Sequence, residues 1–218
     1  MNKREIIEYY NNSKKIIDKS SLTNSYNQWL DLELKEMDAG LSNNCNILEI
    51  GVGSGRVLDY LDNGVRTFTA IDIADVSNLI KKYENREHIK ILNMDAEDLN
   101  FEDNSFDCVI IAYNTIGLML NPHIVLEECK RVLKEDGIIL VSTYGLDAKY
   151  CLDERIKCFK EIGHEVVVSE FQLNISNGVA SYYFQKEELI DLFSKSNLNY
   201  ECIPLTKLGC LWKLTKNI

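Results

Sequence analysis

The sequence predicts an α/β fold, a doubly wound sheet of about seven strands, mostly parallel, with helices on both faces. Two observations support this class. From residue 45 onward, short apolar runs alternate with stretches of helical periodicity, and parallel strands need such helical crossovers, which cover both faces of the sheet. In addition, NILEIGVGSGRVLDYL (46–61) passes from an apolar run through three closely spaced glycines into a helical pattern, as in α/β sheets that bind ligands.

The residues before the sheet are expected to form two amphipathic helices. Their apolar side chains recur at helical spacing, which indicates helices that pack one face against a core. These positions are Ile6, Tyr9, Tyr10, Ile16 and Ile17 in the first helix and Tyr26, Trp29, Leu30, Leu34 and Met37 in the second.

Five apolar runs are the expected strands of the sheet, and two of the helices between them have clear ends. The runs are NILEI (46–50), TFTAID (67–72), HIKILNM (88–94), FDCVIIAY (106–113) and GIILVSTY (137–144). Asp75 is expected to cap a helix with apolar positions at Val76, Leu79, Ile80 and Tyr83. Asn121 followed by Pro122 is typical of a helix start, and this helix is expected to end near Gly137.

After residue 144 the alternation is less regular. We expect a helix over 147–161, then two β-like stretches, 164–175 and 179–184, joined through the turn signal Asn177-Gly178. A helix over 186–195 and two closing strands, YECIPL (200–205) and LGCLWKL (208–214), complete the chain. Since no repeat, low-complexity tract or Pro-rich linker interrupts it, the sequence predicts a single domain.

The composition argues against several classes of function. With 24 Lys and Arg against 34 Asp and Glu, the net charge of -10 repels phosphate backbones, so no nucleic-acid partner is expected. No run approaches the roughly 18 apolar residues of a membrane span, and the N-terminus lacks the apolar region of a signal peptide, so a cytoplasmic protein without a membrane partner is expected. The seven cysteines form no CxxC pair, so we expect neither a disulfide framework nor a metal site, although Cys151 and Cys158 on one helix face leave a thiol-metalloid role open.

The three glycines of EIGVGSG predict a ligand against bare backbone. Dinucleotide sites require G-x-G-x-x-G, but the third position here is Arg56 and the glycine comes one place early, at Gly55. Glu49, two residues before the first glycine, is poorly placed for a pyrophosphate and suits a ligand that carries an ammonium group. A nicotinamide oxidoreductase is therefore disfavoured.

With these residues the chain resembles the class I S-adenosylmethionine-dependent methyltransferases, a family with a Rossmann-like fold, from about residue 46 to 144. The family's E/D-x-G-x-G-x-G loop approaches the methionine part of S-adenosyl-L-methionine, and Glu49, Gly51, Gly53 and Gly55 match it. The resemblance implies an antiparallel last strand, N-terminal helices and a lid insert after the fifth strand.

The same resemblance assigns further cofactor contacts to the ends of later strands. They are Asp72 with both ribose hydroxyls, Ile73 on the adenine face, Asp95 with the adenine amino group, Ala96 with the ring through its backbone, and Ala112 and Tyr113 near the reactive methyl. Because these matches occur in order at strand carboxyl ends, they are more specific together than the glycines alone. From this resemblance we expect the single domain 1–218 to consist of four parts. They are an N-terminal helical cap (1–42), a cofactor-binding core (43–146), a lid or substrate insert (147–185) and a closing helix and strands (186–218).

The implied activity is methyl transfer to a small-molecule acceptor, with an amine or neutral acceptor favoured by the negative net charge. Aromatic side chains in the cap and insert, where similar enzymes form a lid, can hold a planar or cationic acceptor by stacking and cation-π attraction. The candidate acceptor-binding residues are Tyr10, Tyr26, Trp29, Asn114 and Tyr144, and Tyr9, Tyr182 and Tyr183 lie in the same regions. Since aromatic residues at helical spacing are also typical of a core, both interpretations stay open here.

No residue of the sequence identifies itself as a general base. His88, His123 and His164 occur at positions typical of surface or structural histidines, whereas Tyr113 and Tyr144 are better placed, at strand ends. Two alternatives remain, an RNA or protein methyltransferase and a protein that binds the cofactor without transferring its methyl group. The sequence does not determine the acceptor atom or the oligomeric state.

Overall fold

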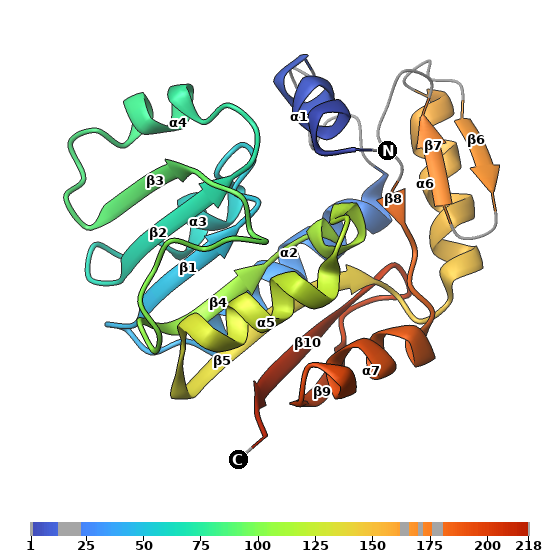
Figure 1. The fold of residues 1–218 in the computed structure, drawn as a ribbon. Helices are drawn as coiled ribbons and strands as arrows, with labels where there is room; N and C mark the ends of the chain where they lie inside the picture. The colour runs from blue at the N-terminus through green and yellow to red at the C-terminus, as the bar shows by residue number, and fades with distance from the viewer. Residues whose placement is uncertain (1, 13–22, 162–165, 170–171, 176–180, 218) are drawn as a thin grey trace.

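The computed structural model describes residues 2–12, 23–161, 166–169, 172–175 and 181–217 (Figure 1). Ile16, Ile17, His164 and the Asn177-Gly178 turn lie outside the described residues. The side chain of Cys158 lies outside them as well, so a thiol-metalloid role of Cys151 and Cys158 stays a prediction.

The central sheet has seven strands in the order β3-β2-β1-β4-β5-β10-β9. They are β1 (Asn46–Ile50), β2 (Thr67–Asp72), β3 (Ile89–Asn93), β4 (Phe106–Ile111), β5 (Leu133–Tyr144), β9 (Leu198–Pro204) and β10 (Gly209–Lys216). The first five strands pair in parallel, and β10 runs antiparallel to both of its neighbours, β5 and β9. This arrangement confirms the predicted fold class, including the antiparallel last strand.

Helices cover both faces of this sheet (Figure 1). The main helices are α2 (Asn24–Ala39) and α3 (Arg56–Leu61) on one face, and α5 (Pro122–Val132) and α7 (Lys186–Lys195) on the other, with α4 (Ser77–Lys82) between β2 and β3. Successive side chains of a strand point to opposite faces. Leu48 and Ile50 therefore join the core beneath α5 and α7, while Ile47 packs with α2 and α3.

The remaining elements lie near the carboxyl ends of the strands. They are α1 (Lys3–Asn12), the 3-10 helix η2 (Thr115–Leu118), α6 (Ala148–Glu161) and a small sheet of β6 (Val166–Ser169), β7 (Gln172–Ile175) and β8 (Ser181–Tyr182). Figure 1 shows α1 above this edge of the central sheet, with α6 and β6 to β8 beside it. The stretch 164–175, expected as one β segment, contains the antiparallel pair β6 and β7.

Two helix boundaries differ from those expected. The helix at Asp75 begins at Ser77, whose backbone N–H donates to Asp75 Oδ1 at 2.9 Å, and Ile80 is exposed on it instead of buried. The helix that starts at Pro122 ends at Val132 and does not reach Gly137. Leu133 already pairs with Phe106 in the β4–β5 ladder, so the sheet ends the helix earlier than any local stop signal.

Candidate functional site

The strands that carry the predicted site lie at the topological switch point of the sheet. β1 and β4 are neighbours at its centre, and the chain continues to β2 and β3 on one side and to β5 on the other. Open α/β sheets bind ligands outside the carboxyl ends of the strands at such a point. The topology therefore brings the residues that follow β1 and β4 to one site.

The loop between β1 and α3 requires its glycines. Gly51, Gly53 and Gly55 have φ angles of 76°, 51° and 84°, in the left-handed region that side chains disfavour. A Cβ atom on Gly51 would also lie 2.5 Å from Thr115 Cγ2. Glycine here lets the loop adopt its turn and pack against η2, which leaves bare backbone at the end of β1.

Glu49 places a buried carboxyl group beside this loop. Its side chain is 2 % exposed, and Oε2 has no hydrogen-bond partner in the part of the chain that the structure describes. Desolvation raises the pKa of Glu49 to about 8, although the nearby Arg56 charge lowers it. A buried oxygen without a partner is costly, and the ammonium group of a ligand would satisfy it. This observation supports the fit of an aminoacyl-bearing cofactor.

Asp72, at the end of β2, is bound to the glycine loop. Its Oδ2 accepts from the Gly53 N–H and its Oδ1 from the Ala74 N–H, both at 2.9 Å. Desolvation raises the pKa of Asp72, and the backbone hydrogen bonds oppose that shift. Ile73 beside it is half-buried. The carboxylate is thus held in one orientation next to the loop, as recognition of a ribose diol requires.

Asp95 contacts the N-terminal helix. Lys3 Nζ lies 2.6 Å from Asp95 Oδ2 and 2.8 Å from Glu97 Oε2. Asn11 Oδ1 also accepts from the Asp75 N–H at 2.7 Å. Ala96 is partly buried against the core beneath α5. Helix α1 is therefore attached by polar contacts at both of its ends to the segments that follow β2 and β3.

The end of β4 has a strained backbone. Ala112 is buried, and the next two residues, Tyr113 and Asn114, have φ angles of 48° and 57°. The Tyr113 N–H donates to Glu33 Oε1 at 2.9 Å, and the fully buried Glu33 also forms an ion pair with Arg56. Left-handed backbone at a non-glycine residue is uncommon and clusters at functional sites. The buried carboxylate of α2 stabilises this conformation.

Glu33 was not predicted from the sequence, because only apolar positions of α2 were read as buried. In the sequence Arg56 is only a departure from the dinucleotide pattern, whereas in the structure it pairs with the buried Glu33 carboxylate. Helical periodicity shows which face of an amphipathic helix is buried, and a charged residue on that face needs a buried partner. The periodicity alone does not identify that partner.

Aromatic side chains from four segments form what we call the aromatic cluster. Its members are Tyr26, Trp29, Tyr113, Tyr144 and Tyr183. Trp29 is central, with its ring centroid 5.2 Å from that of Tyr113 and 5.4 Å from that of Tyr144, which stacks on Tyr183 at 4.1 Å. Three of the candidate acceptor-binding residues, Tyr26, Trp29 and Tyr144, are thus brought together next to the end of β4.

The other two candidate acceptor-binding residues, Tyr10 and Asn114, are not members of the aromatic cluster. Tyr10, on α1, lies near Asp72 and Tyr144, and desolvation raises its pKa above the ordinary value. Asn114 donates through Nδ2 to the Tyr182 carbonyl at 3.0 Å, so it binds the insert to the end of β4. Arg155 of α6 contacts the cluster as well, donating to Tyr113 Oη at 2.6 Å, and the sequence provided no signal for it.

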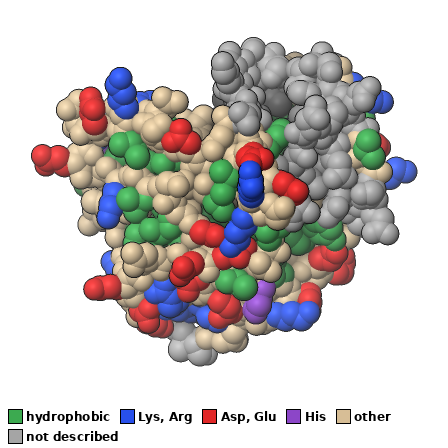
Figure 2. Space-filling model, turned by 45° about the horizontal axis from the view of Figure 1, so that its top comes forward, with side chains coloured by type: hydrophobic (Ala, Val, Ile, Leu, Met, Phe, Trp, Pro, Cys, Tyr) green, Lys and Arg blue, Asp and Glu red, His purple; other side chains and the backbone are tan. Residues whose placement is uncertain are grey.

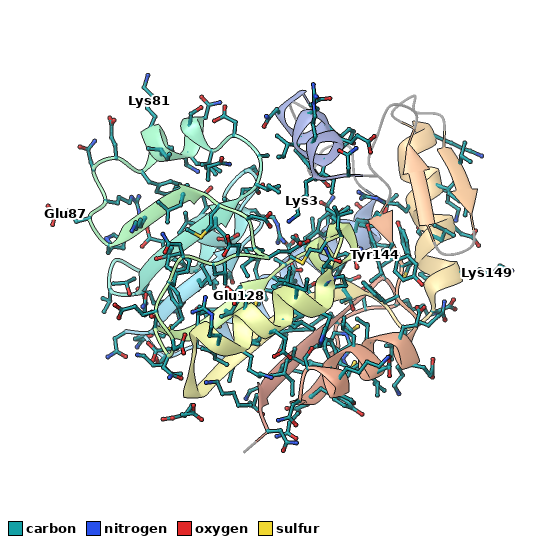
Figure 3. All side chains as sticks on the ribbon, viewed as in Figure 1. Lys3, Lys81, Glu87, Glu128, Tyr144 and Lys149 are labelled. Atoms are coloured by element: carbon teal, nitrogen blue, oxygen red, sulfur yellow. The ribbon has the colours of Figure 1, made fainter. Side chains whose placement is uncertain are left out.

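The described histidines make structural contacts. His88 Nε2 lies 2.9 Å from Asp62 Oδ1, and His123 Nδ1 lies 3.0 Å from Ser196 Oγ. Figure 3 shows Tyr144 and Lys3 near the upper edge of the sheet, and Lys149 extending outward from the start of α6. No group of three or more His, Cys, Asp or Glu side chains within the described ranges is arranged to hold a metal ion. None of the helices described combines the length and apolarity needed to cross a bilayer.

Comparison with known proteins adds family information. Residues 48–141 match the family model described as a methyltransferase domain. The chain is 30% identical over 151 residues to demethylmenaquinone methyltransferase of Staphylococcus aureus, covering 64% of this chain and 60% of the relative. It is 35% identical over 102 residues to an uncharacterised protein of Methanocaldococcus jannaschii, covering 46% of this chain and 45% of that one. The matched part thus spans about half to three fifths of the length of these relatives.

Solved structures share the fold at low sequence identity. The CcbJ methyltransferase of Streptomyces caelestis has a TM-score of 0.72 at 12% identity, with 100% of both chains covered. The 1,6-didemethyltoxoflavin-N1-methyltransferase of Burkholderia thailandensis, solved with 1,6-didemethyltoxoflavin and S-adenosylhomocysteine, has a TM-score of 0.65 at 14% identity, covering 87% of this chain and 79% of that one. At these identities the similarity establishes the fold alone.

Proposed function

We propose that this protein is a class I S-adenosylmethionine-dependent methyltransferase that methylates a small molecule. The match of residues 48–141 to the methyltransferase domain family supports this proposal. The observation that carries the proposal is the pair of carboxyl groups at the glycine loop, of which Glu49 is buried and Asp72 is half-buried. Glu49 has an oxygen without a partner among the described residues, and Asp72 is fixed by the Gly53 N–H. They suit the ammonium group and the ribose diol of one ligand.

The remaining cofactor contacts follow from the positions of the strand ends. Gly51, Gly53 and Gly55 would leave room for the methionine part, and Ala112 and Tyr113 would lie beside the methyl group. For the adenine, the proposal assigns Asp95, with Ile73 and Ala96 beside the ring. S-adenosyl-L-methionine supplies a methyl group that its sulfonium makes electrophilic, and the protein's task is to align the acceptor and exclude water.

The aromatic cluster is the proposed acceptor site. Tyr26, Trp29 and Tyr144 surround the end of β4, next to the segment assigned to the methyl group, and Tyr10 and Asn114 contribute from α1 and η2. Relatives named for demethylmenaquinone and 1,6-didemethyltoxoflavin support a planar small molecule as acceptor.

The free cysteines of the described residues support a cytoplasmic location.

The first experiment tests the cofactor site. Asp72→Ala is expected to weaken S-adenosylhomocysteine binding by at least about 30-fold, since two hydrogen bonds to a charged acceptor are worth several kcal/mol. Calorimetry measures this change. Asp136→Ala removes an exposed carboxylate on β5 and should leave binding unchanged. Equal affinity of Asp72→Ala and the wild-type protein would refute the site assignment.

Radiolabelled S-adenosyl-L-methionine then identifies the acceptor class. A cell extract is incubated with the protein and separated into small-molecule, RNA and protein pools. Label in the small-molecule pool is the expected result. Label in RNA or protein would favour a macromolecular acceptor, and binding without transfer into any pool would favour a protein that only binds the cofactor.

A further inference from the structure

A guanidinium group lies within the aromatic cluster. Arg155 Cζ is 5.6 Å from the ring centroids of both Tyr26 and Tyr113. Tyr144 and Tyr183 are also among the groups that interact most strongly with its charge. A permanent cation here occupies the aromatic faces that a cationic acceptor would use, and it repels such an acceptor. Because salt screens charges beyond about 8 Å, this local cation matters more to the acceptor than the net charge of the chain does.

The contact between Arg155 and Tyr113 leaves the Tyr113 hydroxyl free to act as a second hydrogen-bond donor. Arg155 Nη1 donates to Tyr113 Oη at 2.6 Å, and a phenol has a single proton, which is therefore available to a third group. Desolvation raises the pKa of Tyr113 well above its ordinary value despite the Arg155 charge, so this proton is retained. Tyr26 Oη, also close to Arg155, is buried without a hydrogen-bond partner among the described residues.

Tyr113 is held firmly in this position. Its left-handed backbone, with φ 48°, is stabilised by the hydrogen bond from its N–H to Glu33, and its ring packs on Trp29. A strained residue persists only when its surroundings over-determine it, and such strain is typical of a preorganised site. The hydroxyl and the guanidinium bound to it are thus presented together at the end of β4.

Building on the proposed function, we propose that Arg155, Tyr113 and Tyr26 bind the ionised hydroxyl of a planar acceptor, a phenolate or an enolate. The guanidinium supplies the charge and the two tyrosine hydroxyls supply hydrogen-bond donors. An acceptor bound in its ionised form needs no general base, which accounts for the lack of an obvious base in the sequence. An anionic acceptor of this kind differs from the amine or neutral acceptor that the net charge favours.

The test uses 4-nitrophenol as the probe and the full chain saturated with S-adenosylhomocysteine. The pH is set where half of the free probe is ionised, so that the visible absorbance of the phenolate reports which form binds. We expect the absorbance to rise on binding and 4-nitroanisole, which has no ionisable hydroxyl, to bind at least about tenfold more weakly. A fall in absorbance, or no change at millimolar probe, would overturn the proposal.

Variants then identify the anchor. Arg155→Gln should weaken phenolate binding by roughly 30- to 100-fold and Tyr113→Phe by about tenfold, with Arg155→Lys between the wild type and Arg155→Gln. Lys149→Gln is the matched control, because it removes an exposed cation from the same helix that points away from the cluster (Figure 3). Its affinity should stay within about twofold of the wild type.

Calorimetry with S-adenosylhomocysteine on every variant keeps the two proposals apart. Normal affinity in Arg155→Gln shows that the variant is folded and that the cofactor site is intact. Unchanged phenolate affinity in that variant would then refute the anchor alone. If the wild-type protein failed to bind S-adenosylhomocysteine, the proposed function itself would be refuted.

Discussion

Glu49 lies at the end of β1 with its side chain almost fully buried, and this burial controls its protonation. Desolvation raises its pKa to about 8 in the folded protein, whereas in the unfolded chain it returns to the ordinary value of about 4.3. Between these two values the folded state holds a proton that the unfolded state has released. The stability of the protein without cofactor therefore falls as the pH rises through this window.

The Glu49→Gln variant isolates this effect. It should be more stable than the wild type above pH 5, with a difference that grows to the order of 4 kcal/mol near pH 8. Urea unfolding of the cofactor-free protein from pH 5 to pH 8 measures it. Glu87→Gln, at an exposed site (Figure 3), is the control and should follow the wild-type slope. Parallel curves for the wild type and Glu49→Gln would show that Glu49 is not protonated at neutral pH.

At the scale of elements, Arg131 and Glu128 of α5 hold the segment that carries Asp95. Arg131 donates to the Leu99 and Phe101 carbonyls, each at 2.7 Å, and pairs with Glu128 at 2.7 Å. Glu128 in turn accepts from the Leu99 N–H at 2.9 Å. These contacts satisfy backbone groups of a connection that has no regular structure of its own.

Arg131→Ala is expected to lower the free energy of unfolding by about 2 to 3 kcal/mol, because two carbonyl groups and a carboxylate lose their donor. Chemical denaturation measures the change. Arg4→Ala removes another arginine, which pairs with Glu8 only at the exposed surface of α1, and should cost at most about 0.5 kcal/mol. Similar losses for the two variants would show that Arg131 does not hold this segment.

At the scale of the whole molecule, two hydrophobic clusters on opposite faces of one sheet support the site between them. Cofactor contacts are expected at the ends of β1, β2, β3 and β4, so a ligand would connect four strands.

Acidic and basic side chains are interspersed on the face shown in Figure 2. The absence of a nucleic-acid partner remains a prediction from the net charge of -10.

A ligand that connects these strands should stabilise the entire fold. At 100 times its dissociation constant, S-adenosylhomocysteine should add about 2.7 kcal/mol, which corresponds to a rise of roughly 5 to 10 °C in Tm for a chain of this size. Thermal scanning with and without the ligand measures it. NAD at the same concentration should leave Tm unchanged, and an equal rise with NAD would restore the oxidoreductase interpretation.

The sequence by itself determined the elements of the sheet and the loop at its centre. The strands β1 and β2 and the helix α7 have the expected bounds, because apolar runs and turn residues are local signals. The glycines of the loop, and Asp72 and Asp95 after their strands, were identifiable because spacing along the chain places them at strand ends. Their cofactor roles remain predictions.

Only the tertiary structure decided how distant side chains meet. Glu33 joins Arg56 and the Tyr113 backbone, and Arg155 enters the aromatic cluster from α6, through contacts between residues 23 to 80 positions apart. The early end of α5 at Val132 likewise depends on pairing with β4. No periodicity reports such contacts, since each is favourable only when the surrounding packing excludes water and supplies both partners.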